Sequence, residues 1–199
     1  MAKAPAWRVS RYCETAGNTN VLLQGQSTGL SSPGLLWGAG DNSSGELGGE
    51  YPVTMLHAIA SNVTKAAASG DHSLYVKADG TLWAMGTGIY ARGIADQGYH
   101  YPQAEQIDTG VADVVTSGHT LYLKTDGSLW GMGPGDYGQL GTGITPGLLP
   151  RVQIAENVAA IGAGATFSVY LTANGELWAS GTNAYGQFGD GTTTARGAS

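Results

Sequence analysis

The sequence predicts an all-β fold built from four repeats. Its glycine content, its hairpin signals and the even spacing of its tryptophans carry that prediction. Of the 199 residues, 33 are Gly. A Gly inside a helix costs about 1 kcal/mol relative to Ala, whereas a Gly in a tight turn adopts positive φ without a steric penalty. Many short strands joined by tight turns therefore suit this composition better than helices do.

Four tryptophans mark the repeat. Trp37, Trp83, Trp130 and Trp178 are separated by 46, 47 and 48 residues, and each ends a Gly-x-Leu-Trp phrase. A further Gly stands three residues after each Trp. We interpret these tryptophans as anchors of the repeat core.

A strand and a turn precede each of the last three tryptophans. Residues 73–77, 120–124 and 168–172 contain the alternating pattern of a half-buried strand. Each is followed by Asp-Gly or Asn-Gly, the strongest short hairpin signal, because type I′ turns need positive φ at both central residues. A second glycine-rich phrase follows the tryptophans at residues 45–48, 138–141 and 186–189, and residues 91–94 depart from it in the second repeat.

Prolines give the repeat boundaries. Pro5, Pro52, Pro102 and Pro150 are 47, 50 and 48 residues apart. Terminal repeats are expected to be atypical because their outer faces have no neighbour, and the first repeat is the poorest match. The sequence divides into repeat 1 (5–51, degenerate), repeat 2 (52–101), repeat 3 (102–149) and repeat 4 (150–199) of one structural domain, with residues 1–20 as an N-terminal arm or the first strand of repeat 1.

Together these phrases resemble the regulator of chromosome condensation repeat family. Its blades carry Gly-x-Leu-Trp, then Gly-x-Asn-x-x-Gly-Gln-Leu-Gly, then Pro-x-x-Val, then Gly-x-x-His-Ser-Leu. In this sequence the four phrases are clearest at residues 175–178, 181–189, 150–152 and 70–74. The match is strong over residues 34–191 and weak over 1–33. The resemblance implies a β-propeller of four-stranded antiparallel blades.

The number of repeats sets the main structural question, because the family commonly has seven blades and this sequence has four repeats. The chain could close as a small four-bladed ring, since propellers have about 4–8 blades. It could instead form a partial ring completed by another copy, or an open stack held by a larger assembly. A lone open array is the least favourable arrangement, because it exposes strand edges.

Charge and hydropathy exclude several classes of partner. The net charge is −6, and the nine Lys and Arg residues are dispersed, whereas nucleic-acid binding needs clustered cations. We expect no membrane insertion, since no stretch of 18 apolar residues occurs. No secretory signal is visible. We therefore expect the protein in the cytoplasm or assembled inside the cell into a particle such as a virion.

No catalytic, cofactor or metal site is expected. Residues 25–29 match Gly-x-Ser-x-Gly, but no helix pattern follows, as a nucleophile elbow requires. Residues 133–138 match Gly-x-Gly-x-x-Gly and are interpreted as a turn between strands. His72 and His119 hold equivalent repeat positions without a second ligand at metal-binding spacing. The resemblance makes both blade-packing residues that bond nearby backbone.

Aromatic residues are the candidate interaction sites. Tyr combines apolar area with a polar tip, which suits interfaces. Three tyrosines recur in the loop after each Trp strand, a second aromatic cluster lies in the degenerate part of repeat 2, and one Trp lies in the N-terminal arm. These residues are Tyr90, Tyr137 and Tyr185, then Tyr99, His100 and Tyr101, and finally Trp7.

The resulting functional hypothesis is a non-enzymatic structural or interaction β-propeller. We expect protein partners or self-association, in a larger assembly such as a phage or virus particle (tail, fibre or capsid decoration). The resemblance implies an alternative, guanine-nucleotide exchange or other regulatory partner binding. A third hypothesis is a carbohydrate-binding surface that uses the exposed aromatic rings to bind a glycan.

Overall fold

The structure, a computed structural model, describes residues 11–14, 19–24, 33–49, 53–87, 100–143 and 147–197. Within these ranges the fold is all-β, as the sequence predicts, and no helix that could cross a membrane occurs in them. The strands are β1 (Arg11–Glu14), β2 (Thr19–Gln24), β3 (Gly34–Gly40), β4 (Val53–Ala68), β5 (His72–Lys77), β6 (Leu82–Thr87), β7 (His100–Asp108), β8 (Val111–Thr116), β9 (Thr120–Lys124), β10 (Leu129–Pro134), β11 (Leu148–Ala155), β12 (Val158–Ala163), β13 (Phe167–Thr172) and β14 (Leu177–Gly181).

All strand pairs are antiparallel, and neighbours in sequence are neighbours in the sheets. The sheets contain β1 to β7, β8 to β11, and β12 to β14. The long strand β4 pairs with β3 through its first part and with β5 through its last part. It therefore belongs to two blades. We define blade 1 as β1–β3 with the first part of β4, blade 2 as the rest of β4 with β5–β7, blade 3 as β8–β11, and blade 4 as β12–β14.

A left-handed residue turns the chain from the outer strand of one blade into the inner strand of the next. Asn62, Gly110 and Asn157 have φ of 59°, 70° and 59°. Their carbonyl oxygens accept hydrogen bonds of 2.7–2.8 Å from the backbone N–H of the hairpin turn of the blade being entered. A sequence repeat that begins at its proline therefore contains the outer strand of one blade and the inner strands of the next blade.

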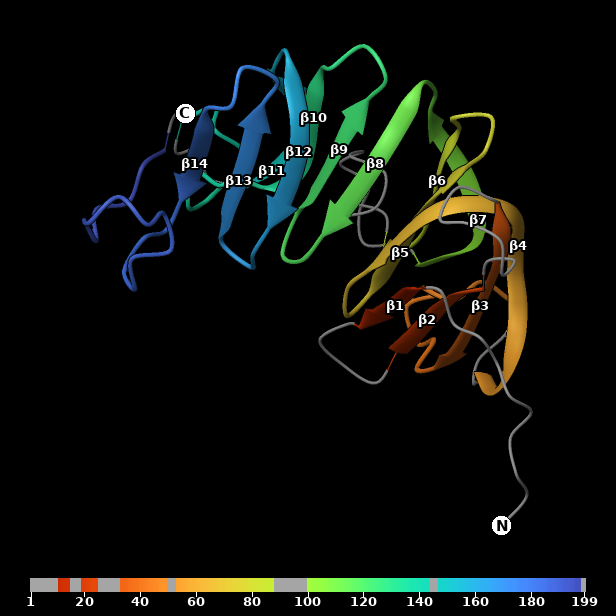
Figure 1. The fold of residues 1–199 in the computed structure, drawn as a ribbon. Coiled ribbons are helices and arrows are strands. Elements are labelled where there is room, and N and C mark those ends of the chain that lie inside the picture. Colours follow the sequence, from red (N-terminus) through yellow and green to blue (C-terminus); the bar gives the residue numbers. More distant parts are fainter. Residues whose placement is uncertain are drawn as a thin grey trace.

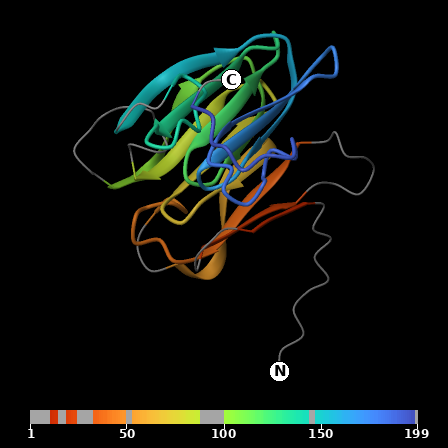
Figure 2. The same ribbon diagram turned by 90° about the vertical axis from the view of Figure 1, so that its left-hand side faces the viewer.

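The four blades form an open arc. Blade 1 and blade 4 lie at opposite ends of it (Figure 1), and in the view from the side of blade 4 the strands of blade 1 lie below those of blade 4 (Figure 2). The small closed ring considered from the sequence is therefore not what this single chain forms. Three successive blade-on-blade packings do not bring the last blade back to the first.

The core lies in the seams between successive blades. One hydrophobic cluster joins blades 1 and 2, a second joins blades 2 and 3, and a third joins blades 3 and 4. The Leu of the Gly-x-Leu-Trp phrase is fully buried in each seam, at Leu36, Leu82 and Leu129. Fully burying a Leu side chain contributes about 1.5–3 kcal/mol, so each blade depends on its neighbours for stability.

Candidate interaction surface

The tryptophans lie at the margins of the seams. Trp37, Trp83 and Trp130 are partly buried, and Trp178 is 41% exposed. In blades 2, 3 and 4 each ring stacks on the Tyr directly opposite on the preceding strand, with centroids 6.3–6.4 Å apart. The stacked pairs are Tyr75–Trp83, Tyr122–Trp130 and Tyr170–Trp178.

A polar relay fixes the indole in blades 2 and 3. In blade 3 the Trp130 indole N–H donates to the Ser128 hydroxyl (3.0 Å), which donates to the Asp126 carboxylate (2.7 Å). These hydrogen bonds from Ser128 lower the pKa of Asp126 below its ordinary value. Lys124 Nζ lies 5.2 Å from the Trp130 ring centroid, a cation–π distance. Blade 2 repeats the relay with Asp79, Thr81 and Trp83.

His119 joins blade 3 to blade 4. Its side chain is fully buried, and its Nε2 lies 2.6 Å from Ser168 Oγ. The Ser168 hydroxyl donates to the Gln139 carbonyl oxygen (2.6 Å), so its oxygen is free to accept the Nε2–H of a neutral imidazole. Burial lowers the pKa of His119 to about 4. The ring is thus a neutral connector between blades.

His72 plays the same part between blades 2 and 3. Its Nε2 lies 2.7 Å from Thr116 Oγ1, and its Nδ1 lies 3.0 Å from Asp71 Oδ1. Both histidines therefore pack in the seams, but they bond hydroxyl groups of the following blade, where the sequence led us to expect backbone. The matching position in blade 4 is Phe167.

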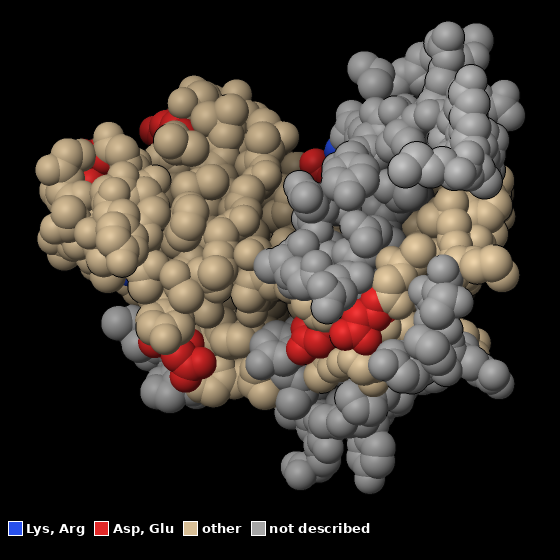
Figure 3. Space-filling model, turned by 90° about the horizontal axis from the view of Figure 1, so that it is seen from below, with Lys and Arg blue, Asp and Glu red and all other residues tan. Residues whose placement is uncertain are grey.

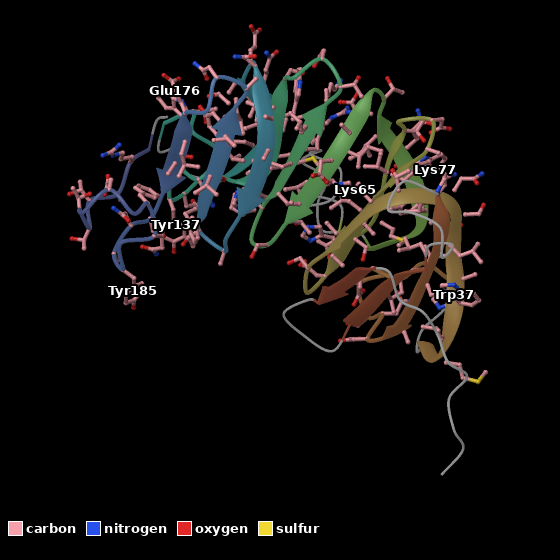
Figure 4. The ribbon with its side chains drawn as sticks, in the orientation of Figure 1. Trp37, Lys65, Lys77, Tyr137, Glu176 and Tyr185 are labelled. Carbon is pink, nitrogen blue, oxygen red and sulfur yellow. The ribbon has the colours of Figure 1, made fainter. Side chains whose placement is uncertain are left out.

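Two of the predicted tyrosines stand exposed in equivalent corner loops. Tyr137 follows β10 and is 52% exposed, and Tyr185 follows β14 and is 93% exposed. Figure 4 shows both on the same lower side of the arc, whereas Glu176 lies at the opposite end of blade 4. The structure thus presents two aromatic side chains on adjacent blades toward the same side.

Side-chain amides hold these corners in shape. Gln139 Oε1 accepts the Tyr137 backbone N–H (3.0 Å), and Gln187 Oε1 accepts that of Tyr185 (2.9 Å). The following glycine, Gly138 or Gly186, has a φ of 73°, which a β-carbon would disfavour. The Gly-Gln phrase found in the sequence is therefore the frame of each corner.

The other predicted interaction residues cannot be placed on this surface. Tyr90, Tyr99 and Trp7 lie outside the described residues. His100 and Tyr101 belong to β7, whose first residues are described as backbone only.

On the face seen in Figure 3, acidic side chains form separate patches, and little Lys or Arg is visible among the described residues. A shallow pocket of about 420 Å³ lies beside Trp130 and is lined by Lys124, Asp126, Gln153 and Glu156, among others. Among the described residues no group of three or more His, Cys, Asp and Glu is placed to bind a metal.

Sequence reasoning missed one further surface. Leu171 and Leu177 of blade 4 are 38% and 66% exposed. Their phrases are the same as those of blades 2 and 3, so no local pattern distinguishes them.

Comparison with known proteins explains this architecture. Residues 126–171 and 158–187 match two family models described as the regulator of chromosome condensation (RCC1) repeat. Residues 126–187 are RCC1 repeats. Among curated proteins none matches the sequence significantly.

Solved structures share the fold of the whole arc. Yeast RCC1 (Prp20), solved bound to Kap60, matches with a TM-score of 0.80 at 13% identity, over 99% of this chain and 49% of that one. Prp20p of Saccharomyces cerevisiae, in a structure reported with its binding to Gsp1p and histones, matches at 0.76 and 14%, over 98% and 50%. Human WBSCR16 matches at 0.69 and 17%, over 90% and 51%. The chain thus spans about half the length of these proteins, and the β-propeller blade expected from the sequence is confirmed.

Proposed function

We propose that this chain is a non-enzymatic protein-interaction module whose exposed corner tyrosines contact a protein partner. The observation that carries the proposal is the pair Tyr137 and Tyr185, exposed in equivalent corners of adjacent blades. RCC1-type repeats provide the rigid scaffold, and loops on rigid scaffolds commonly carry binding residues.

The corners suit this role energetically. A Tyr side chain brings a large contact area at a low cost in conformational entropy. The hydrogen bonds from Tyr137 N–H to Gln139 and from Tyr185 N–H to Gln187 order the backbone before binding. Preordered loops lose little further entropy on association, so the exposed rings have the character of binding hot spots.

The test compares three immobilised proteins: the native chain, the double variant Tyr137→Ser/Tyr185→Ser, and the control Glu176→Ser. Ser44 holds the same corner position in blade 1, and its backbone N–H donates to the Glu46 carboxylate. The corner therefore accommodates a Ser. Glu176 is exposed at the other end of blade 4. Proteins retained from a cell extract are quantified by mass spectrometry.

We expect at least one protein to be retained by the native chain and the control but about tenfold less by the double variant, a loss of about 1.4 kcal/mol. Equal retention by all three proteins would refute the role of the tyrosines.

The sequence leads us to expect two other activities, nucleotide exchange and glycan binding, and each has its own assay. Nucleotide exchange is measured as release of a labelled guanine nucleotide from a small GTPase, and glycan binding as retention on a glycan array. No described residue specifically favours either. The narrower hypothesis of a virus-particle subunit gains no support from the similar structures, and we do not propose it.

A further inference from the structure

The pocket beside Trp130 combines an aromatic ring with polar and charged side chains. Its volume of about 420 Å³ is large enough for a small ligand or for a side chain of a partner protein. We call it the Trp130 pocket. The corner tyrosines are not among its lining residues, so the inference is independent of the proposed function. The lining residues are Lys124, Asp126, Ser128, Trp130, Gln153, Glu156 and Asn157.

The hydrogen-bond donors of this pocket are directed at its own carboxylates. The Trp130 indole N–H donates to the Ser128 hydroxyl over 3.0 Å, and this hydroxyl donates to Asp126 Oδ1 over 2.7 Å. On the neighbouring strand, Gln153 Nε2 donates to Glu156 Oε1 over 3.1 Å. Both series of hydrogen bonds therefore end on one oxygen of a carboxylate.

The acceptors of the pocket keep unused capacity. The backbone N–H and the hydroxyl of Ser128 both donate to Oδ1 of Asp126, and Gln153 donates to Oε1 of Glu156. From the described part of the chain, no donor reaches Asp126 Oδ2, Glu156 Oε2 or the side-chain oxygen of Gln153. An ionised carboxylate only accepts hydrogen bonds. The pocket therefore suits a ligand that is rich in donors.

The cations of blade 3 are bound to other groups. Lys124 Nζ lies 2.8 Å from Asp108 Oδ1, and Asp108 does not line the pocket. Arg151 donates to the Ile107 carbonyl oxygen of blade 2. The Lys124 ammonium also lies 5.2 Å from the Trp130 ring centroid, which shows that this ring already attracts a cation. Within the pocket, the carboxylates of Asp126 and Glu156 remain without a cationic partner.

Blade 2 gives an internal comparison for this pocket. It has the same Asp, the same Trp and the same Gln, with a Thr hydroxyl in place of that of Ser128, but Thr109 and Gly110 hold the positions of Glu156 and Asn157. The second carboxylate is therefore a feature that blade 3 has and blade 2 lacks. The shared residues of blade 2 are Asp79, Thr81, Trp83 and Gln106.

We propose that the Trp130 pocket binds the arginine side chain of a protein partner. A guanidinium has five N–H donors and no acceptor, which matches the unused oxygens of Asp126, Gln153 and Glu156. Its planar fork pairs with carboxylates, and guanidinium groups are attracted to aromatic rings such as that of Trp130. A Lys ammonium has fewer donors and no planar fork. A neutral ligand would leave the charge of the two carboxylates unbalanced.

The test follows the indole N–H signals of the full chain by NMR while Nα-acetyl-arginine amide is added. The Trp130 signal is assigned by its loss in Trp130→Phe. We expect this signal to shift and to saturate at millimolar ligand, and the Trp83 signal to stay in place because blade 2 lacks the second carboxylate. Nα-acetyl-citrulline amide has a neutral urea group of nearly the same size and should give no saturating shift.

Two variants test the carboxylate itself. Glu156→Thr introduces the residue of blade 2 and should weaken arginine binding by about fivefold, the upper range for one exposed ion pair. Glu176→Thr is the matched control, because it removes the same charge from blade 4 (Figure 4) and should leave the affinity unchanged. Both side chains are exposed, so the melting temperature should be the same in both variants.

Three results would overturn the proposal. The Trp130 signal could show no saturating shift with the arginine derivative, which would mean that the pocket does not bind this side chain. The citrulline derivative could bind equally well, which would mean that the positive charge is not recognised. Glu156→Thr could bind as tightly as the native chain, which would mean that this carboxylate takes no part.

Discussion

His119 illustrates how single residues join the blades. It is buried in the seam and reaches Ser168 of the next blade over 2.6 Å. Ser73 of blade 2 holds the position equivalent to Ser168. Its buried hydroxyl oxygen has no hydrogen-bond partner among the described residues. A His of one blade therefore bonds a hydroxyl group of the next blade at two seams, the one between blades 2 and 3 and the one between blades 3 and 4.

The first prediction concerns His119 and pH. Burial lowers its pKa in the folded state to about 4, from an ordinary 6.5, so between these pH values the unfolded chain binds more protons. The titration of His119 therefore costs no stability above pH 6.5. As the pH drops to about 4 the free energy of unfolding falls, by roughly 2–3 kcal/mol at pH 4.5.

His119→Phe introduces the residue that blade 4 has at this position, and it removes the titration. Urea unfolding at pH 7 and pH 4.5 should show a smaller loss for the variant than for the native chain. Measurements above pH 4 avoid protonating Asp71 and Asp108, whose pKa values are lowered from their ordinary value. An equal loss in both proteins would contradict the burial of a neutral His119.

At the scale of the strands, close contacts between turns determine the spacing of blades 3 and 4. A Cβ on Gly118 would lie 2.2 Å from the Ala165 carbonyl oxygen in the turn between β12 and β13. That atom belongs to the backbone and cannot rotate away. Gly118 is therefore needed for the close approach of the two turns and not for an unusual φ.

The second prediction follows from this contact. Gly118→Ala should lower the free energy of unfolding by about 2 kcal/mol, the typical cost of overpacking. The neighbouring Ser117→Ala is the control and should change it by less than about 0.5 kcal/mol. Chemical denaturation measures both. If the two variants were equally stable, blades 3 and 4 would be packed less closely than described.

The hairpins could be predicted from local chemistry. Asp79-Gly80 and Asp126-Gly127 indicate turns with positive φ, and both glycines have it, at 78° and 84°. The course of β4 could not be predicted, because its pairing partners change from β3 to β5 within one strand. In the sequence, nothing distinguishes Asn62, in the middle of β4, from an ordinary strand or turn residue.

The surface was predictable only in part. The repeat places Tyr137 and Tyr185 in equivalent loops, and the structure shows both exposed. The exposure of Leu177 was not predictable from local sequence, because this residue stands in the same phrase as the buried Leu82 and Leu129. The following blade covers Leu82 and Leu129, whereas no blade of the described chain covers Leu177. This difference comes from the arrangement of the blades and not from the local sequence.

At the scale of the molecule, the blades form a one-dimensional stack. In such arrays stability is approximately a sum of one contribution from each repeat and one from each interface between neighbouring repeats. The arc spans about half the length of the RCC1-type structures it matches.

Small-angle X-ray scattering tests most directly whether one chain forms an open arc. The native chain at low concentration should give a one-chain mass with the scattering curve of the open arc in Figure 1. A native chain with a one-chain mass and the compact curve of a closed four-bladed ring would contradict the open arc.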